Sequence, residues 1–401
     1  MRDAAPDTAR FLADLHELRR IGAFRTGVHR PTYTPDDMRS REWLMAKMRE
    51  VGLEPEMDGI GNVIGRHKGP GRTLLAGSHI ETQDEAGWLD GALGVVAALA
   101  LAREGLPVDV IAFADEEGHY GDFLGSRSAI GLVTEAEMDA ARHATHGKPL
   151  REALREAGLE GRPRLRLDPA RYEGFLELHI EQGSQLEAAG MRSGPVTGIV
   201  GVRVWRIRAL GQQDHTGGTT MAERKDAAVA AMRVLAAIDD QFPMLAGPRT
   251  TWTCGRIALT PNAPHVIAGE AEMIFQFRDL SEEVLDRLEE RLRRIVQEVD
   301  RRDRCAVTLE PVSRAAAAPS APAFHAAICR AAERHAPGAW AAMPSGAIHD
   351  AQWMARVMPA AMLFTPSIGG ISHHWTEDTA AADLELSLRI LHDAAREILA
   401  A

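Results

Sequence analysis

Two short segments of the sequence together supply a histidine and several acidic side chains. The first segment, GSHIETQDEAGWLDG, contains His79 and Asp90. The second, FADEEG, contains the adjacent pair Glu116 and Glu117. Imidazoles and carboxylates bind zinc and related divalent cations, and one carboxylate can bridge two ions. Because adjacent residues at the end of a strand point in different directions, one glutamate can bind a metal while the other accepts a proton from water. The two segments predict half of a two-metal hydrolytic site.

Further histidines lie in two segments downstream. ELHIEQG supplies His179, and GGISHHWTED supplies His373 and His374. A lone histidine is more often structural than a ligand, and an acidic pair is usually a solvated surface element. The combination favours function, because most of these groups directly follow apolar, strand-like runs beside glycines. Side chains at such positions converge on a crevice.

Composition limits the classes of partner. The chain has 401 residues, 45% of them hydrophobic, and a net charge of -11 without a long basic run. These values predict a globular protein of two domains that acts on a small molecule and binds neither nucleic acid nor an anionic membrane. The three cysteines form no CxxC motif, which argues against a disulfide framework or a thiolate zinc site. No secretory leader or membrane span is apparent, so we expect a cytoplasmic protein.

The first third of the sequence has an α/β pattern. Thr34 as N-cap, Pro35 at the first helical position and Gly52 as a stop predict a helix. Short apolar runs predict strands, and an alanine-rich segment between them predicts a helix: residues 62–65, 74–76 and 108–113 for the strands and 92–103 for the helix. This alternation predicts a mainly parallel central sheet flanked by helices, with a ligand site at the carboxyl ends of its strands.

The pattern changes between about residues 202 and 312. VRVWRIRAL alternates like a strand, and a strand-helix-strand-helix unit is completed by three further segments: a helix at 226–242, a strand at 270–277 and a helix at 281–300. Residues 313–323 are small and contain proline, as is typical of a crossing between domains. We therefore predict a catalytic domain split in sequence, residues 1–201 and 318–401, with a smaller α+β domain inserted at 202–317.

The chain resembles a known family over most of its length. Segments spanning residues 77–378 match in order: GSHIETQ, DGALGV, DEEG, LGSRSAIG, ELHIEQGSQLE, HTGGTTMAERKDA, PNAPHVIAG, FQFRD, SGAIHDAQ and GGISHHWTED. They are similar to the amidase, hydantoinase and carbamoylase branch of the M20 metallopeptidases, which includes N-carbamoyl-L-amino acid hydrolases, β-ureidopropionases and allantoate amidohydrolases. The resemblance implies that the inserted domain is a lid and dimerisation domain and that the protein is a homodimer.

The resemblance also implies two divalent cations per subunit, with Asp90 as a bridge: His79, Asp90 and His179 for one ion, and Asp90, Glu117 and His373 for the other. Neutral imidazoles and carboxylates favour zinc, with manganese or cobalt as alternatives. Glu116 would then accept the proton of the attacking water and pass it to the leaving nitrogen.

Substrate-binding residues are also implied by the resemblance. Arg278 would bind the substrate carboxylate through its planar fork of donors, unless it is a surface arginine paired with Asp279. His215 would stabilise negative charge on the scissile carbonyl and would come from the other subunit. Gln182 and His349 match residues that contact substrate, although either could be purely structural.

The sequence departs from the family pattern at several positions, three of which bear on the metal and substrate sites. The usual HxD motif is HIE, so Glu81 would have to orient His79 with one additional methylene. In PNAPHVIAG, His265 stands where relatives have a substrate-binding asparagine, and Ala268 replaces a proline. Because an imidazole offers a different donor and acceptor geometry from an amide, we expect a different substrate tail.

The leading interpretation is a metal-dependent hydrolase of linear C–N bonds. Its favoured reaction is hydrolysis of the ureido group of an N-carbamoyl amino acid, which releases carbon dioxide and ammonia. Hydrolysis of another N-acyl or amide bond is an alternative within the same family. A metal-binding scaffold without catalysis is an alternative of a different class, although the retention of Glu116 argues against it.

Overall fold

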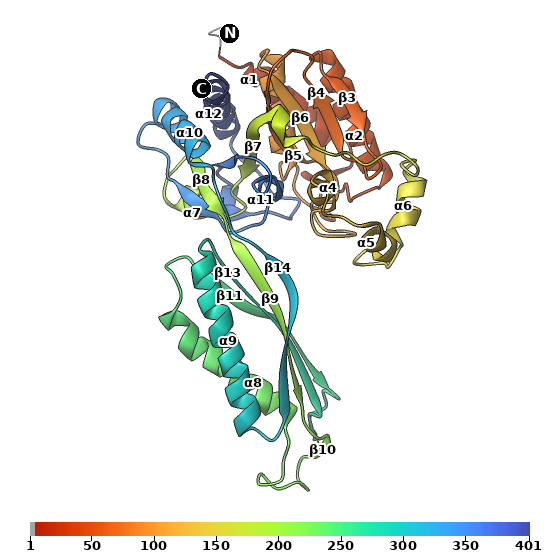
Figure 1. The fold of residues 1–401 in the computed structure, drawn as a ribbon, viewed down its shortest axis with the longest axis vertical. Coiled ribbons are helices and arrows are strands. Elements are labelled where there is room, and N and C mark those ends of the chain that lie inside the picture. The colour runs from red at the N-terminus through yellow and green to blue at the C-terminus, as the bar shows by residue number, and fades with distance from the viewer. Residues whose placement is uncertain (1–4) are drawn as a thin grey trace. The chain divides into compact units, whose positions relative to one another are not determined.

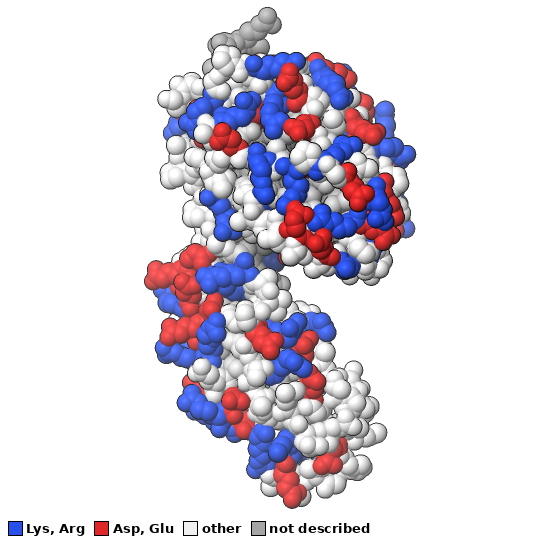
Figure 2. All heavy atoms as spheres, turned by 45° about the vertical axis from the view of Figure 1, so that its right-hand side comes forward, with Lys and Arg blue, Asp and Glu red and all other residues white. Residues whose placement is uncertain are grey.

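The computed structural model describes residues 5–401, which form two compact units (Figure 1). The first, here called the split unit, combines the chain up to Gly198 with Pro319–Ala401. The second, the inserted unit, comprises Ile199–Ala318. None of the described helices is long and apolar enough to span a membrane. On the face drawn in Figure 2, acidic and basic side chains are interspersed over the split unit.

A nine-stranded mixed sheet forms the centre of the split unit. Its strands run in the order β15-β8-β17-β7-β5-β6-β4-β3, with β16 beside β8. Their bounds are β3 Glu54–Met57, β4 Val63–Arg66, β5 Thr73–His79, β6 Val108–Phe113, β7 Tyr172–Ile180, β8 Gly194–Ile199, β15 Ala318–Pro319, β16 Met343–Ser345 and β17 Ala360–Thr365. The four central strands β17, β7, β5 and β6 are parallel, whereas β8, β4 and β3 pair antiparallel with their neighbours. The predicted α/β class is confirmed, with the parallel arrangement confined to the central strands.

Helices cover this sheet because their apolar faces, and those of the strands, are buried against one another. The principal helices are α1 Thr8–Arg19, α2 Pro35–Glu50, α3 Ala92–Arg103, α10 Pro322–His335 and α12 Ala381–Leu399, and shorter ones are α4 Leu124–Ala129, α5 Glu135–Ala140, α6 Leu150–Glu156, α7 Gln185–Ala188 and α11 Asp350–Met354. Helix α3 is apolar all round and is buried from Ala92 to Ala102, as expected of a helix enclosed on every side. It contacts β5, β6 and β7 on one side and α1 on another.

The capping signals of α2 operate as the sequence predicts. The Thr34 side chain accepts a hydrogen bond from the main-chain N–H of Asp37 at 3.3 Å, and Pro35 occupies the first turn. The helix ends before Gly52, whose φ of 83° lies in the left-handed region. This helix delivers the buried side chain of Arg41 toward the end of β5.

The inserted unit has its own core. A four-stranded antiparallel sheet in the order β11-β13-β9-β14 packs against two helices, and a two-stranded ribbon joins β10 to β12. The bounds are β9 Gly201–Leu210, β10 Asp214–His215, α8 Ala227–Gln241, β11 Thr251–Thr260, β12 Val266–Ile267, β13 Glu270–Asp279, α9 Glu282–Arg302 and β14 Ala306–Ala315. Alternate residues of β13, among them Phe275 and Phe277, are buried in one cluster with Leu288 and Leu292 of α9.

The sequence analysis missed the two outer strands of this sheet. Strands β11 and β14 are mostly exposed, and each has a register shift, at Cys254/Arg256 and at Pro311/Ser313. Exposed edge strands lack a clean alternation of apolar and polar residues, and proline removes a ladder donor. Residues 313–315 therefore belong to β14, and the predicted crossing at 313–323 is shorter than we expected.

Candidate metal centre

Four of the five predicted metal ligands lie at or after the carboxyl ends of the central strands, and the fifth, His373, lies in the loop after the 3-10 turn Ile368–Gly370. His79 is the last residue of β5, and His179 is the last but one of β7. Asp90 precedes Gly91, the N-cap residue of α3. The pair Glu116–Glu117 follows β6 by three residues. Because these strands are parallel, their carboxyl ends meet at one edge of the sheet and bring the side chains together.

Asp90 lies at the centre of the cluster, and its two carboxylate oxygens have different neighbours. Its Oδ1 is 3.2 Å from His179 Nε2 and 3.6 Å from His79 Nε2. Its Oδ2 is 3.1 Å from His373 Nε2, which is also 3.6 Å from Glu117 Oε2. The five side chains thus form two groups of three that could each hold a metal ion and that share Asp90.

Hydrogen bonds orient the two buried imidazoles toward Asp90. His79 Nδ1 lies 3.0 Å from the main-chain carbonyl of Glu81, and His179 Nδ1 lies 2.9 Å from that of Ile180. A carbonyl only accepts, so Nδ1 carries the hydrogen and the Nε2 lone pair faces the cluster when the ring is neutral. This tautomer is the one that an imidazole needs to bind a metal through Nε2, so the residues fit a divalent cation.

The electrostatics of the cluster also fit cations. Burial raises the pKa of Glu116 well above its usual range, and the charges of Glu117 and Asp90 add to the shift although His79 opposes it. Burial likewise raises the pKa of Glu117, with Asp90 as the next cause. Burial acts on Asp90 in the same direction, but hydrogen bonds with the surrounding imidazoles outweigh it and hold that pKa well below its usual range. Several buried carboxylates at close range are costly unless positive charge offsets their repulsion.

Glu377, which the sequence analysis did not single out, holds the main chain beside Asp90. Its carboxylate accepts hydrogen bonds from the main-chain N–H groups of Leu89 and Asp90, both at 3.1 Å, and from the Ser372 hydroxyl at 3.0 Å. Burial, followed by the charge of Asp90, raises the pKa of Glu377 to about 8. Gly87 makes room for this carboxylate, because a Cβ there would lie 2.0 Å from Glu377 Cδ.

We expected the Glu81 side chain to orient His79, but the structure gives this contact to the Glu81 main chain. The hydrogen bond to His79 Nδ1 comes from the Glu81 main chain, and the nearer carboxylate oxygen, Oε1, lies 3.9 Å from that nitrogen. Oε2 instead pairs with the guanidinium of Arg41 at 2.7 Å, and neither side chain is exposed. Burial opposes ionisation of Glu81, but Arg41 and His79 outweigh it and lower the pKa.

A third group of candidate ligands adjoins the first. Glu177 and His179 occupy alternate positions of β7 and therefore share one face, a spacing that could have identified Glu177 from sequence. Glu177 accepts hydrogen bonds from the Ser78 hydroxyl at 2.6 Å and the main-chain N–H of Ala351 at 2.9 Å. The ring of His349 packs edge-on against His179, with centroids 4.5 Å apart. Burial and the charge of His179 hold the pKa of His349 well below its usual range, which keeps His349 neutral.

The structure also brings Gln182 into the cluster. Its backbone has a φ of 56°, in the left-handed region, and its side-chain amide donates to Asp90 Oδ2 at 2.9 Å and to the Ser372 hydroxyl at 3.2 Å. Gln182 and His349 thus both lie next to the candidate ligands. Their contact with substrate stays a prediction.

His215 and His265 lie together in the inserted unit. His215 in β10 pairs with Val266 in β12, and the main-chain carbonyl of His265 accepts from Thr216 N–H at 3.4 Å. His215 Nδ1 accepts from the N–H groups of the next two glycines, Gly217 at 3.1 Å and Gly218 at 2.9 Å. The neutral ring therefore carries its hydrogen on Nε2 and offers that N–H as a donor.

Arg278 belongs to β13 of the same unit. Its Nη2 donates to Gln276 Oε1 at 3.2 Å, two residues earlier on the same face of the strand. Burial lowers the pKa of Arg278, which is the cost of partly removing this cation from water. Asp279, the alternative partner suggested by the sequence, accepts hydrogen bonds from Ser281 N–H and the Thr250 hydroxyl.

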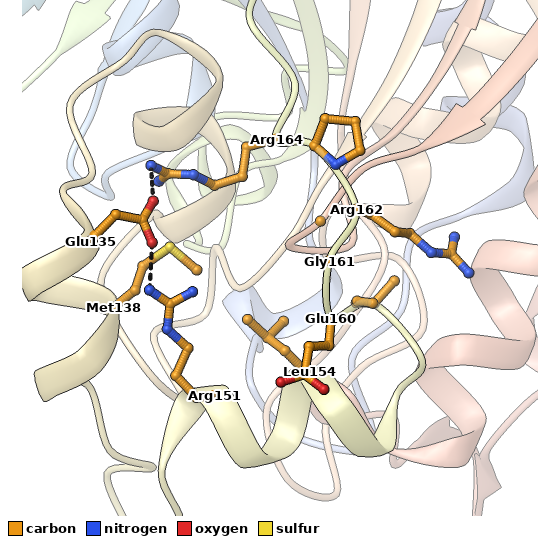
Figure 3. Close-up of a pocket in the computed structure, with 11 residues that line it drawn as sticks. Glu135, Met138, Arg151, Leu154, Glu160, Gly161, Arg162 and Arg164 are labelled. Atoms are coloured by element: carbon orange, nitrogen blue, oxygen red, sulfur yellow. Dashed lines mark hydrogen bonds and ion pairs between the residues drawn. The ribbon is translucent and has the colours of Figure 1, made fainter.

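A separate cavity of about 440 Å³ lies in the split unit between α5, α6 and residues 159–164. Figure 3 shows Glu135 between Arg151 and Arg164, with which it forms ion pairs. None of the residues that line it was predicted to belong to the site. Because Glu135 and Asp139 together offset the charges of these two arginines, the Asp90 cluster is the stronger candidate for chemistry.

Comparison with known proteins shows the family to which the chain belongs. The family model of peptidase family M20/M25/M40 matches residues 82–397. N-carbamoyl-L-amino-acid amidohydrolase of Paenarthrobacter aurescens is 33% identical, with 94% of this chain and 96% of the relative covered. Allantoate amidohydrolase of Bacillus subtilis is 31% identical, with 92% of each chain covered.

A solved structure extends the likeness to the whole chain. It is an amidase of the hydantoinase/carbamoylase family from Burkholderia phymatum, with a TM-score of 0.91, 40% identity and coverage of 100% of this chain and 99% of the other. The likeness therefore includes both the split and the inserted unit. The chain belongs to peptidase family M20/M25/M40, within the branch of the hydantoinase/carbamoylase amidases.

Proposed function

We propose that this protein is a metal-dependent amidohydrolase that hydrolyses the ureido group of an N-carbamoyl amino acid, with release of carbon dioxide and ammonia. Membership of the family and relatives named as amidohydrolases support an amidohydrolase function. The observation that carries the proposal is the pair of ligand groups that share Asp90, beside the unassigned carboxylate of Glu116. Relatives named for N-carbamoyl amino acids and for allantoate support a ureido substrate.

The candidate ligands divide the work of metal binding between two sets. His79, Asp90 and His179 would hold one divalent cation, and Asp90, Glu117 and His373 the other. Bound cations, zinc in the first instance, would acidify a water and polarise the scissile carbonyl. Glu116 is not needed as a ligand. Its Oε2 lies 3.5 Å from His79 Nε2, so it stands at the edge of the first group, where it can accept a proton.

Each unit offers candidate substrate-binding residues of its own. Arg278 offers two parallel N–H donors for the substrate carboxylate, and the Nε2–H of His215 is a donor for the carbonyl oxygen as negative charge develops there. In the split unit, Gln182 and His349 lie beside the ligands and would contact the ureido end. Glu116 would return the proton to the leaving nitrogen.

Two other functions compete with this proposal. The same residues could hydrolyse another N-acyl or amide bond, since the catalytic groups recognise the carbonyl and not the group beyond it. A scaffold that binds metal without catalysis would not require Glu116. The presence of its carboxylate beside the first ligand group therefore favours an enzyme.

The test is a substrate screen with metal-reconstituted protein. Purified protein, stripped with a chelator and reloaded with zinc, manganese or cobalt, is assayed with N-carbamoyl, N-formyl and N-acyl amino acids by detection of ammonia and amine. We expect N-carbamoyl substrates to release ammonia, chelation to abolish this activity and the cations to restore it. Full activity in demetallated protein would reject the mechanism.

The variant Glu116→Gln separates an enzyme from a scaffold. The enzyme should lose turnover by about 10²-fold or more while its metal content is unchanged, because glutamine cannot accept the proton. A protein whose metal content and every measurable activity are the same in both forms would be a scaffold.

A further inference from the structure

Glu81 connects the catalytic loop to helix α2 through a series of buried charges. We propose that Glu81 is a positioning residue for the base Glu116, which it holds through the main chain, and that it does not act mainly through His79. This inference rests on the proposed function, because it assumes that Glu116 is the base. It also explains why this position has a glutamate, whose side chain is long enough to contact both Arg41 and Glu116.

The two oxygens of Glu81 have separate partners. Oε1 accepts a hydrogen bond from the main-chain N–H of Glu116 at 2.7 Å. Oε2 accepts from Arg41 Nη2, also at 2.7 Å. The Glu81 and Arg41 side chains are fully buried, so water does not compete with the contact between them. Hydrogen bonds of this kind, in which a partner is ionised, are about twice as strong as neutral ones.

Arg41 is itself held in place from several sides. Its Nε pairs with Asp37 Oδ1 at 2.9 Å, and its Nη1 donates to the main-chain carbonyl of Gly61 at 2.7 Å. Asp37 in turn accepts from Tyr33 N–H at 2.8 Å. The guanidinium is therefore a fixed anchor, and the Glu81 carboxylate between it and Glu116 cannot move freely.

The loop that carries Glu116 needs such an anchor because strand β6 has ended at Phe113. Asp115 adopts a φ of 57°, and its carboxylate accepts from the main-chain N–H groups of His119, Tyr120 and Gly121 at 2.9, 3.0 and 2.9 Å. These bonds hold the loop beyond the base. The hydrogen bond that the Glu116 N–H donates to Glu81 holds the main chain of the base itself, so Glu81 supplies the contact that fixes the position from which the Glu116 side chain extends.

The length of the side chain decides which partner it serves. Because the main-chain carbonyl of Glu81 already orients His79, the Glu81 carboxylate is not needed for that contact. An aspartate is shorter by one C–C bond, about 1.5 Å. It could not keep both 2.7 Å contacts, to Arg41 and to Glu116, from the same backbone position.

The two possible roles of Glu81 predict different defects. If it positions Glu116, then Glu81→Asp and Glu81→Gln should lower kcat by about 10²-fold, since a displacement of about 1 Å in a catalytic group has that effect. KM and metal content should stay within about twofold of the unmodified protein, because Arg278 and the ligands are untouched. If it acts through His79, metal affinity should fall and excess zinc should restore kcat.

Asp109→Asn is the matched control. Asp109 is also a fully buried carboxylate in this sheet that accepts from an arginine, Arg171 at 2.7 Å, and from a main-chain N–H, that of His67 at 2.8 Å. It lies near the opposite end of β6 from Glu116. A loss of stability from breaking such a network should therefore appear in this variant too, without the effect on kcat.

Hydrogen exchange of the metal-free protein gives a measurement that does not depend on turnover. We expect the Glu116 N–H to exchange about tenfold faster or more in Glu81→Gln, because glutamine cannot accept from Arg41 and Glu116 at once, and to be unchanged in Asp109→Asn. Unchanged exchange and unchanged kcat in both Glu81 variants would overturn the inference, as would a kcat that excess zinc restores. If the unmodified protein hydrolyses none of the substrates screened, the proposed function fails while the exchange result still reports on the contact.

Discussion

A single carboxylate, Asp90, is the residue on which both candidate ligand groups depend. Its Oδ1 faces His79 and His179, and its Oδ2 faces His373. Asp90→Ala should therefore remove both cations, whereas His373→Ala should remove one, because the other group stays complete. Metal analysis of the purified variants checks this. His374→Ala is the control, since that neighbouring imidazole contacts the Thr376 hydroxyl and belongs to neither group. Equal stoichiometry in Asp90→Ala and His373→Ala would contradict a bridging carboxylate.

Variants of Arg278 test the proposed role of this residue in binding the substrate carboxylate. Arg278→Lys should mainly raise KM, because lysine keeps the charge but loses the paired donors. Arg278→Ala should also lower kcat by about tenfold or more, because the substrate is no longer oriented. Steady-state kinetics of both variants separate the two effects. A substrate analogue without its carboxylate serves as the control, and its hydrolysis by the unmodified protein at the full rate would remove the reason for assigning Arg278.

At the scale of elements, two loops are packed closely together. One precedes α3, and the other follows η3 (Ile368–Gly370). Glu377 of the second loop accepts hydrogen bonds from the Leu89 and Asp90 amides of the first. Gly87 leaves the space that the Glu377 carboxylate fills. Gly87→Ala should displace Glu377, release the Leu89 and Asp90 amides and lower metal occupancy, with a loss of about 1–3 kcal/mol in the free energy of unfolding. Chemical denaturation and metal analysis measure both. Gly255→Ala, where an added Cβ meets no atom within 4 Å, is the control. Normal metal content in Gly87→Ala would show that the loops adjust independently.

The elements that sequence predicts well are those whose signals are local. Helix α3 and strand β6 have the predicted bounds, because a long alanine-rich segment and a short apolar run are unambiguous. The ligands at the strand ends could be placed together for the same reason. Arg41 and Glu377 could not, since their partners lie far away in sequence and depend on how α2 and the loop after η3 pack. The role of the Glu81 main chain was equally inaccessible, because residue types do not reveal which atom of a residue makes a contact.

For the whole molecule, the inserted unit supplies a surface suited to self-association. Its sheet has β11 and β14 as outer strands, and these expose Ile257 and Val312, with 45% and 47% of their surface accessible. Outer strands present unpaired main-chain groups that another strand can use. We therefore expect a homodimer in which two copies of this sheet, or of its helices, associate about a twofold axis. Light scattering of the purified protein measures the mass directly, and a monomer at every concentration would contradict it.

If the dimer also completes each active site with His215 from the other subunit, two inactive variants should complement each other. Glu116→Gln keeps His215, and His215→Ala keeps Glu116. In a mixed dimer, the subunit with an intact base receives an intact histidine from its partner, while the other site is defective in both. After dissociation and random reassociation of equal amounts, about a quarter of all sites should be active, since half of the dimers are mixed and half of their sites are complete. Each variant taken alone through the same cycle is the control. Mixed dimers without turnover would show that His215 acts within its own chain or not at all.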